Sequence, residues 1–553
     1  MQAVWKVAPA DPRSAERLAE ALSIHPLTAQ VLLNRGLADA AAAGRFLQPT
    51  LEALEDPLAI SDLPLAVNRL RRAAASNDPV VIFGDSDVDG LTASVILSEV
   101  LQQLGARVSA HQSNRLRDGY GVPRTFLRQL KRLKGRVLIL VDCGTNQAED
   151  VRRVTAEGIA VIIVDHHVPL SEAAKPFALV NPYCGRSAAG RGLCSAGLAL
   201  KIAQALLRQP AHEALHPYLD LAALGTLADC APLLGDNRVM VVEGLPRLLQ
   251  THRPGLRRVC ESTSISQAEP EQILKRLTPR LNASGRLGEA STVWRLLRGV
   301  APAAIDELLK ANAADHGTTK RLQRRIVAEA HEQANRLHCR DQRVIVVSGR
   351  GWHQGLMGPL ASQLAERYGR PAIAVAVDGQ RGIGSGRSVP HVNLLDVLQA
   401  CRSLLMRFGG HAQACGLTMH QRHLEPFRAL INEQARRLHG AAGWIKRRLI
   451  DLELPLEAMA PGWVGELQRC APFGAGNPRP TVVVRNLTIE LASPRIARLS
   501  DGQRSIRGKG VFGGVLPDGR YDVLATPALE GDGVVMQVAD VKVSTGLALH
   551  GRI

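Results

Sequence analysis

The sequence has no paired cysteines, few aromatic residues and no long apolar run. None of its nine cysteines forms a C-x-x-C pair, which argues against a disulfide framework or a zinc ribbon and favours reduced thiols. No apolar stretch approaches the roughly 20 residues of a membrane-spanning helix. The first residues, MQAVWKVAPADPR, have neither the apolar core nor the cleavage site of a signal peptide. We therefore expect a cytoplasmic protein.

What the sequence does have is length, apolar content and positive charge. Its 553 residues suggest three or four domains of about 150 residues each. The formal net charge is +17 and the isoelectric point is near 9.9. Such a charge does not bear on the fold, but it favours a polyanionic partner. Nucleic acid is the leading candidate, and a ribosomal partner stays open at this point.

Three short apolar runs in the first third of the chain each end in acid: PVVIFGDSDVDG (79–90), RVLILVDCG (136–144) and IAVIIVDHH (159–167). Unalternated runs of five or six Val, Ile and Leu residues predict buried parallel strands. Ligands bind beyond the carboxyl ends of such strands. The residues expected to converge there are Asp85, Asp87, Asp89, Asp142, Asp165, His166 and His167. Because so many carboxylates repel one another unless cations neutralise them, the pattern predicts a metal site.

The pattern along the chain predicts an α/β protein with several domains. We expect an N-terminal helical cap, a doubly wound parallel-sheet domain, a long helical connector broken near His316 and Gly317, a smaller α/β domain, a linker and a C-terminal β-rich, OB-like domain. Their expected ranges are 1–75, 76–300, 301–340, 341–440, 441–480 and 481–553.

The GDSDVDG and DHH motifs indicate which kind of metal site to expect. GDSDVDG resembles a calcium loop, but an EF-hand needs Glu at position 12, where this chain has Ile96, and a helix rather than a strand in front. In DHH, a carboxylate and imidazoles together suit manganese or magnesium, with manganese favoured. A fourth carboxylate, Asp229, ends the apolar run in LAALGTLADCAPLL. Combined, these segments favour a metal centre over isolated structural residues.

Together, GDSDVDG, VDCG, VDHH and GTLADCAPL resemble the four motifs of the DHH phosphoesterase superfamily. Later segments are similar to the RecJ family, the single-strand-specific 5′-to-3′ DNA exonucleases of bacteria; these are NRLRDGYG, PRLNASGR, GWHQGLMG, GSGRS, FGGHAQACG and PFGAGNPRP. The resemblance covers about residues 60–480 in order. It implies a DHH domain, a DHHA1-type domain at FGGHAQACG and an OB-fold in the C-terminal β region.

The resemblance also implies roles for individual residues. The ligands of two divalent ions, Mn²⁺ or Mg²⁺, would be Asp85, Asp87, Asp142, His166 and Asp229. His167 would face the substrate near the scissile phosphate, and Asp89 would stabilise the turn and support the ligands. Asp165 would orient a histidine, as metal-bound imidazoles usually require.

Substrate contacts follow from the same resemblance. A 5′-terminal phosphate would be held by Arg115, Ser385 and Arg387, since guanidinium groups and freely exposed amides suit phosphate oxygens. Tyr120 would stack on a base near the 5′ end. Residues expected along the strand near the metals are Arg280, Asn282 and Arg286, and those expected on the nucleotide path from the second domain are Gly409, Gly410 and His411.

The expected function is metal-dependent hydrolysis of single-stranded DNA from the 5′ end to 5′-mononucleotides, in repair and recombination. A phosphodiesterase for short oligonucleotides or cyclic dinucleotides, a pyrophosphatase of the same superfamily, and an inactive DNA-binding scaffold are the alternatives. Partners implied are single-stranded DNA, a single-strand-binding protein and a helicase, with no membrane, for a monomeric enzyme. One departure stands out: after residue 480 the only aromatic residues are Phe512 and Tyr521, although OB-folds usually stack bases on aromatic rings.

Overall fold

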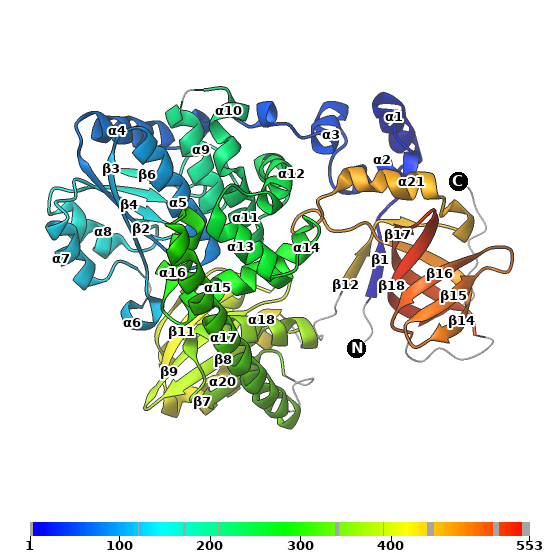
Figure 1. Cartoon of the computed structure of the whole chain (residues 1–553). Coiled ribbons are helices and arrows are strands. Elements are labelled where there is room, and N and C mark those ends of the chain that lie inside the picture. The colour runs from blue at the N-terminus through cyan, green and yellow to red at the C-terminus, as the bar shows by residue number, and fades with distance from the viewer. Residues whose placement is uncertain are drawn as a thin grey trace. The chain divides into compact units, whose positions relative to one another are not determined.

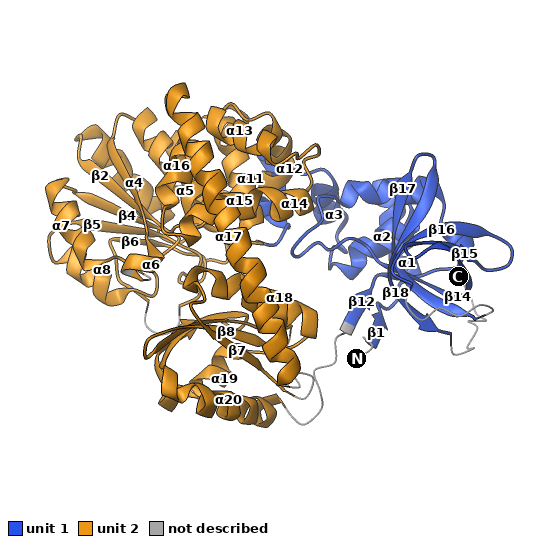
Figure 2. Cartoon of the chain, turned by 60° about the horizontal axis from the view of Figure 1, so that its bottom comes forward, with its two compact units in different colours: residues 1–53, 232–239, 445–553 blue, residues 54–231, 240–444 orange. Residues whose placement is uncertain are grey.

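The computed structural model describes most of the chain in two compact units (Figures 1 and 2). Unit 1 comprises residues 1–53, 232–239 and 445–553, and unit 2 comprises residues 54–231 and 240–444. The described residues are 4–119, 121–169, 173–207, 209–337, 342–390, 392–439, 447–512 and 519–544. None of the helices in these ranges combines the length and apolar character that crossing a membrane requires.

Unit 2 begins with a fully parallel five-stranded sheet in the order β3-β2-β4-β5-β6. Its strands are β2 Pro79–Gly84, β3 Arg107–Gln112, β4 Val137–Val141, β5 Ala160–Val164 and β6 Ala178–Val180. Every residue of β4 is buried, because helices cover both faces of the sheet. This confirms the predicted doubly wound parallel sheet and the reading of its apolar runs as strands.

The two faces of this sheet are covered by different helices. On one face, Phe83, Leu138 and Leu140 pack with side chains of α7 (Arg124–Arg132) and α8 (Ala148–Thr155). On the other face lie α4 (Leu63–Ala75), α5 (Val88–Gln103) and α9 (Ser195–Leu207), and α5 also packs against α11 (Leu219–Ala228). Both α5 and α9 are almost wholly buried, which fixes their N-termini beside the strand ends.

A 35-residue helix, α17 (Pro302–Arg336), follows α15 (Thr278–Arg286) and α16 (Ala290–Arg298). The expected break at His316 and Gly317 is wrong, because α17 runs through both residues. Glycine costs a helix only about 1 kcal/mol, and tertiary packing outweighs that cost. The buried Asn312 donates hydrogen bonds from Nδ2 to the carbonyl of Arg280 at 3.0 Å and to Ser284 Oγ at 3.2 Å, which ties α17 to α15.

The second sheet of unit 2 is mixed, with the order β10-β11-β9-β8-β7. Its strands are β7 Ile345–Arg350, β8 Ala372–Asp378, β9 Arg381–Arg387, β10 Leu405–Gly410 and β11 Ala414–His420. One face packs against α17 and α18 (Met357–Tyr368), and the other packs against α19 (Leu394–Gln399) and α20 (Leu424–His439). Only β7 and β8 pair in parallel.

Side chains occupy the outer edge of β7. Asn432 on α20 accepts from the amide of Val344 and donates to its carbonyl, both at 3.0 Å. Arg428 donates to the carbonyl of Val346 at 3.1 Å. On α17, Gln333 pairs with both the amide and the carbonyl of Ser348. Unpaired strand edges invite pairing with another chain, and these contacts block that pairing.

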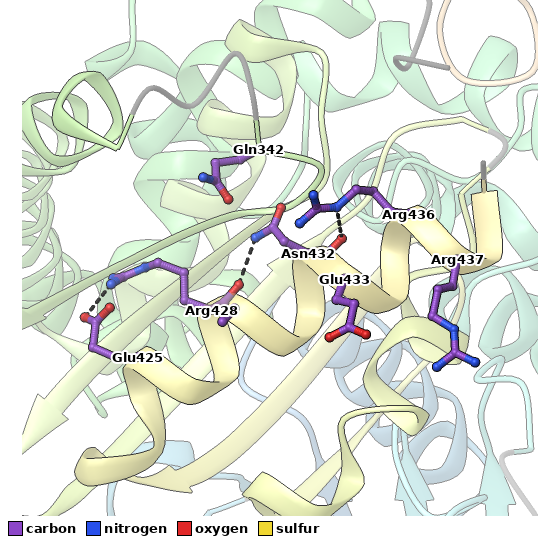
Figure 3. A pocket seen from close by; sticks show the side chains of 8 residues that line it. Gln342, Glu425, Arg428, Asn432, Glu433, Arg436 and Arg437 are labelled. Carbon is purple, nitrogen blue, oxygen red and sulfur yellow. Dashed lines mark hydrogen bonds and ion pairs between the residues drawn. The ribbon is translucent and has the colours of Figure 1, made fainter. Parts of the chain in front are cut away.

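A surface cavity of about 710 Å³ lies along α20 (Figure 3). Its described lining residues come from α20 and from Gln342. The cavity therefore lies beside α20, and none of the predicted site residues lines it.

Unit 1 is built around a small barrel. Strands β14 (Val482–Ser493), β15 (Ile496–Ser500), β16 (Ser505–Gly510), β18 (Gly533–Val543) and β17 (Tyr521–Glu530) pair in this order, and β14 pairs with β17 to close the ring. This agrees with the expected OB-like domain. A short strand, β13 (Leu452–Glu453), extends it along β14.

The N-terminal residues differ from the expected all-helical cap. Besides α1 (Pro12–Leu22), α2 (Pro26–Asn34) and α3 (Ala40–Leu47), they contain β1 (Val4–Val7), which pairs in parallel with β12 (Arg447–Ile450). Trp5 and Val7 pack against Ile450, Val483 and Leu524, a long-range partnership that no local pattern reveals. The segment 441–480, for which the sequence predicts a linker, also contributes Trp463 and Val464 to the core of this unit.

A buried arginine anchors residues 232–239 in unit 1. The Arg238 side chain, only 2% exposed, donates hydrogen bonds to the carbonyls of Phe46 at 2.6 Å, Cys470 at 3.1 Å and Ala471 at 2.6 Å. Its guanidinium carbon also lies 3.8 Å from the centre of the Phe46 ring. Burial lowers the pKa of Arg238 to about 10, which leaves it charged at neutral pH.

Candidate metal centre

Neighbouring parallel strands deliver acids to one edge of the first sheet. Asp85 follows β2, Asp142 follows β4 and Asp165 follows β5. The ladder continues into these residues, since the amide of Asp142 donates to the carbonyl of Val164 at 2.9 Å. Asp142 adopts a left-handed conformation with φ of 59°, an uncommon geometry for a residue with a Cβ. Such strain clusters at functional sites, where the surrounding structure holds it in place.

Carboxylates and imidazoles gather at this edge in three overlapping groups, in each of which the ligand atoms lie within 4.8 Å of one another. The groups are Asp85, Asp87 and Asp142; Asp89, His166 and Asp229; and Asp142, His166 and His167. Asp142 and His166 each belong to two groups, so the arrangement suits neighbouring cations that share ligands. Carboxylate oxygens with a few imidazole nitrogens are donors that fit Mn²⁺ and Mg²⁺.

The buried acids Asp89 and Asp142 and the exposed Asp229 all lie near His166. His166 Nε2 lies 3.2 Å from Asp142 Oδ1 and 3.7 Å from carboxylate oxygens of both Asp89 and Asp229. Burial, together with the Asp229 carboxylate, raises the pKa of Asp89 to about 7. Burial and the charge of Asp89 likewise raise the pKa of Asp142. Buried charges need compensation, and bound cations would provide it.

Asp165 holds the second histidine of the DHH motif. Its Oδ1 lies 2.7 Å from His167 Nδ1 and accepts hydrogen bonds from the amides of His166 at 2.8 Å and His167 at 3.2 Å. Burial by itself would raise the pKa of Asp165 and lower that of His167. The interaction between the two residues outweighs burial, so the pKa of Asp165 lies below its ordinary value and the pKa of His167 is raised to about 9. The expected orienting role of Asp165 therefore concerns His167.

Arg115 points at the same acids. Its Nε lies 2.9 Å from Asp85 Oδ1 and its Nη2 pairs with Asp85 Oδ2, while Asp87 Oδ2 is 3.7 Å from Nη2. Ser113 Oγ also donates to Asp85, at 2.8 Å. The Arg115 side chain remains 45% exposed, so it lies at the mouth of the site. Tyr120, the expected stacking residue, lies outside the described residues.

Helix α15, which carries the PRLNASGR motif, packs directly on the loop that bears Asp85 and Asp87. Asn282 Oδ1 accepts a hydrogen bond from the amide of Val88 at 3.0 Å. A Cβ on Gly285 would overlap the carbonyl oxygen of Ser86, so only glycine allows this approach. Arg286 is near enough for the charge of Asp87 to raise its pKa, although burial lowers that pKa overall. Arg280 has a buried Nε with no hydrogen-bond partner among the residues that the structure describes.

In the second domain, Ser385 and Arg387 lie on the same side of β9. Arg387 Nη1 is 3.5 Å from Ser385 Oγ, and Gly358 near the start of α18 leaves space beside both side chains. Burial lowers the pKa of Arg387, and the charge of Arg115 lowers it further. Arg115, from the first domain of unit 2, is therefore close enough for its charge to affect the pKa of Arg387 in the second domain.

The FGGHAQACG motif forms the turn between β10 and β11. Gly409 and Gly410 pair with Gly416 and Cys415. Gly410 has φ of 135°, and a Cβ there would overlap the carbonyl oxygen of Ala414, so this position requires glycine. His411 follows, exposed to solvent. Although the residue is exposed, partial burial of its ring lowers the pKa of His411, and the charge of His167 lowers it further.

Ser195 contributes to the site without having been predicted. It starts α9, and its hydroxyl donates to Asp142 Oδ1 at 3.0 Å while its amide donates to Asp89 Oδ2 at 2.8 Å. In the sequence, Ser195 can be recognised only as a serine at the start of a helix, where serine commonly caps the free amides. That signal does not identify which distant carboxylate the serine would meet.

Three family models match the chain in sequence order. The model described as the DHH family N-terminal domain matches residues 79–226, the DHHA1 domain matches residues 341–437, and the RecJ OB domain matches residues 450–498. These ranges correspond to the parallel sheet, the mixed sheet and part of the barrel.

Curated relatives extend the similarity over most of the chain. The single-stranded-DNA-specific exonuclease RecJ of Thermus thermophilus is 33% identical over 500 residues, covering 88% of this chain and 71% of that protein. The RecJ of Bacillus subtilis is also 33% identical and the match covers 88% of this chain. The chain spans 62% of the length of that second relative.

Solved structures agree with this relationship. RecJ of Thermus thermophilus in complex with Mn²⁺ superposes with a TM-score of 0.83 at 27% identity, covering 100% of this chain and 81% of that one. A RecJ exonuclease bound to manganese is 31% identical, with a TM-score of 0.59, and covers 68% of this chain and 95% of that one. Sequence and fold together show that this chain belongs to the RecJ family of single-stranded-DNA-specific exonucleases.

Proposed function

We propose that this chain removes nucleotides from the 5′ end of single-stranded DNA by metal-dependent hydrolysis. The observation that carries the proposal is the set of three ligand groups that share Asp142 and His166. Relatives with this fold were solved with Mn²⁺ or Mg²⁺. The residues that would hold these cations are Asp85, Asp87, Asp142, His166 and Asp229, and Asp89, which lies within reach of His166 and Asp229, would support them.

The protein side chains and the cations have separate tasks in this proposal. When bound, a cation pair lowers the pKa of an attacking water and stabilises charge on the phosphodiester oxygens. The protein holds the ligands in place and directs His167 through Asp165 toward the scissile phosphate. Arg280 and Arg286 supply positive charge beside the acidic loop, which suits the phosphates of the strand. Asn282, in contrast, has its amide oxygen committed to the loop itself.

Selection of the 5′ end requires a pocket for a terminal phosphate. Arg387, Ser385 and the start of α18 form one wall of that pocket, and Arg115 provides a guanidinium from the opposite domain. A helix N-terminus and two guanidinium groups are well suited to a dianion. The nucleotide path would continue along Gly409, Gly410 and His411. Recruitment by a single-strand-binding protein or a helicase, a monomeric state and a cytoplasmic location stay predictions.

End-labelled digestion tests the proposal. A long single strand labelled at its 5′ end should release labelled mononucleotide first with Mn²⁺ or Mg²⁺, whereas the same strand labelled at its 3′ end should release its label last. Preferential release of the 3′ label would contradict the polarity. Faster cleavage of a dinucleotide than of the long strand would favour the small-substrate alternative.

A variant pair tests the terminal pocket. Arg387→Ala should reduce the preference for a 5′-phosphorylated over a 5′-hydroxyl strand by about tenfold or more while Mn²⁺ affinity stays at the wild-type value. A matched control is Arg381→Ala at the exposed start of the same strand, which should leave the preference unchanged. An unchanged preference in Arg387→Ala would remove this residue from the pocket.

A further inference from the structure

Ser195 touches two acids of the metal centre at once. Its hydroxyl donates to Asp142 Oδ1 at 3.0 Å, and its backbone amide donates to Asp89 Oδ2 at 2.8 Å. The next amide, that of Ala196, donates to the other oxygen of Asp89, also at 2.8 Å. Ser195 is fully buried, and Asp89 and Asp142 are 3% and 2% exposed. These three contacts come from a single helix start that lies outside the strand-end loops.

The contacts matter because both acids meet the same imidazole. His166 Nε2 is 3.2 Å from Asp142 Oδ1 and 3.7 Å from Asp89 Oδ2. Those are the two oxygens that Ser195 holds. A rotation of either carboxylate would change its distance to His166, and hence the geometry offered to a cation.

The first turn of α9 is suited to this task. It is the N-terminus of a 13-residue helix, where free amides and the helix dipole stabilise negative charge. The amides of Ser195 and Ala196 take both oxygens of Asp89, which leaves the serine hydroxyl for Asp142. One helix start thereby holds both acids, Asp89 in the first turn of α5 and Asp142 directly after β4.

We propose that Ser195 is a positioning residue of the metal centre, whose hydroxyl fixes the Asp142 carboxylate in the orientation that lets it serve two neighbouring cations. This inference rests on the proposed function. Hydrogen-bond partners of metal ligands commonly change metal affinity about 10- to 100-fold when they are removed. We therefore expect loss of the hydroxyl to weaken metal affinity, and to lower the exonuclease rate only because less metal is bound.

The surrounding packing allows a clean substitution. Helix α11 crosses α9 at Gly225, where a Cβ would overlap the Ala196 side chain and lie 3.1 Å from Asp89 Oδ1. Position 225 therefore has no room for a side chain, and the first turn of α9 is closely packed there. Ser195→Ala removes the hydroxyl alone and keeps both backbone amides on Asp89, so it isolates the contact to Asp142.

The test compares Ser195→Ala with wild type and with Ser98→Ala, a control serine on α5 that is 1% exposed. Mn²⁺ affinity is measured on the metal-free full chain by titration calorimetry and by the electron paramagnetic resonance signal of free Mn²⁺. We expect affinity about tenfold or more weaker in Ser195→Ala and unchanged in Ser98→Ala. Exonuclease activity of Ser195→Ala should recover as Mn²⁺ is raised, which a merely structural defect would not show.

Wild-type Mn²⁺ affinity in Ser195→Ala would overturn the positioning role while leaving the proposed function intact. Failure of the wild-type chain to bind Mn²⁺ would instead overturn the metal centre itself, and the positioning role with it. Ser195→Gly, which also keeps the amides, serves as a second variant. If neither variant retains the circular dichroism spectrum of the wild type, the hydroxyl is structural and the proposal is wrong.

Discussion

Gly285 offers the sharpest test of how α15 supports the acidic loop. Helix propensity alone predicts that Gly285→Ala stabilises the protein by about 1 kcal/mol. The structure predicts the opposite, because the new Cβ would overlap the carbonyl oxygen of Ser86 and lie 3.3 Å from its carbonyl carbon. Restoring an ordinary contact of about 3.5 Å requires a shift of about 1 Å. That shift would move the loop bearing Asp85 and Asp87.

A misplacement of about 1 Å at a catalytic centre can cost about a hundredfold in rate, and overpacking costs about 1–3 kcal/mol. We expect initial exonuclease rates to fall about a hundredfold at saturating Mn²⁺ and unfolding in urea to show a net loss of up to about 2 kcal/mol. Gly317→Ala on α17 is the control, since its Cβ would meet only the flexible Arg321 side chain at 3.5 Å. The control should be fully active and slightly more stable. A stabilised, fully active Gly285→Ala would refute the reasoning.

Three further predictions follow from the contacts described. Asp142→Ala should lower the rate more than about a hundredfold, about 3 kcal/mol of transition-state stabilisation, because it removes a ligand shared by two groups; a folded variant with wild-type rates would show that the centre is misassigned. Arg238→Met should cost about 3 kcal/mol or more in urea unfolding, since buried carbonyls lose charged donors, and a loss under about 1 kcal/mol would contradict this. Asn432→Ala should cost about 2 kcal/mol by freeing the backbone of Val344, next to β7, and light scattering should detect more self-association than in wild type.

The sequence predicts the first sheet well because its strands are buried on both faces. A run such as that of β4 needs no partner to be recognised, and parallel strands necessarily bring their carboxyl ends to one edge. The convergence of Asp85, Asp142 and His166 follows from that geometry. Here the local sequence pattern and the global fold agree, so the sequence alone predicts the acidic edge of the sheet.

The positions that sequence reasoning missed depend on distant partners. Ser195 is an ordinary helix-start serine until α9 is placed against Asp142, 53 residues earlier. Asn282 sits in a motif whose resemblance suggests DNA contact, yet its oxygen binds the amide of Val88 across 194 positions. The break expected at Gly317 fails for the same reason, because packing of α17 on α15 outweighs a small local preference. Strand β1 likewise exists only through its pairing with β12.

The barrel of unit 1 has few aromatic residues, which limits how it could bind single-stranded DNA. Phe512 and Tyr521, its aromatic residues after position 480, are 5% and 4% exposed and belong to the core, so they have no face to offer a base. Arg485 is paired with both Glu453 and Asp522, and Lys509 with Glu530. Neither aromatic ring is therefore available for stacking on a base. Base stacking contributes about 1–3 kcal/mol per base in such domains, so we expect any strand binding by this barrel to rely on its basic side chains and to weaken strongly as salt is raised.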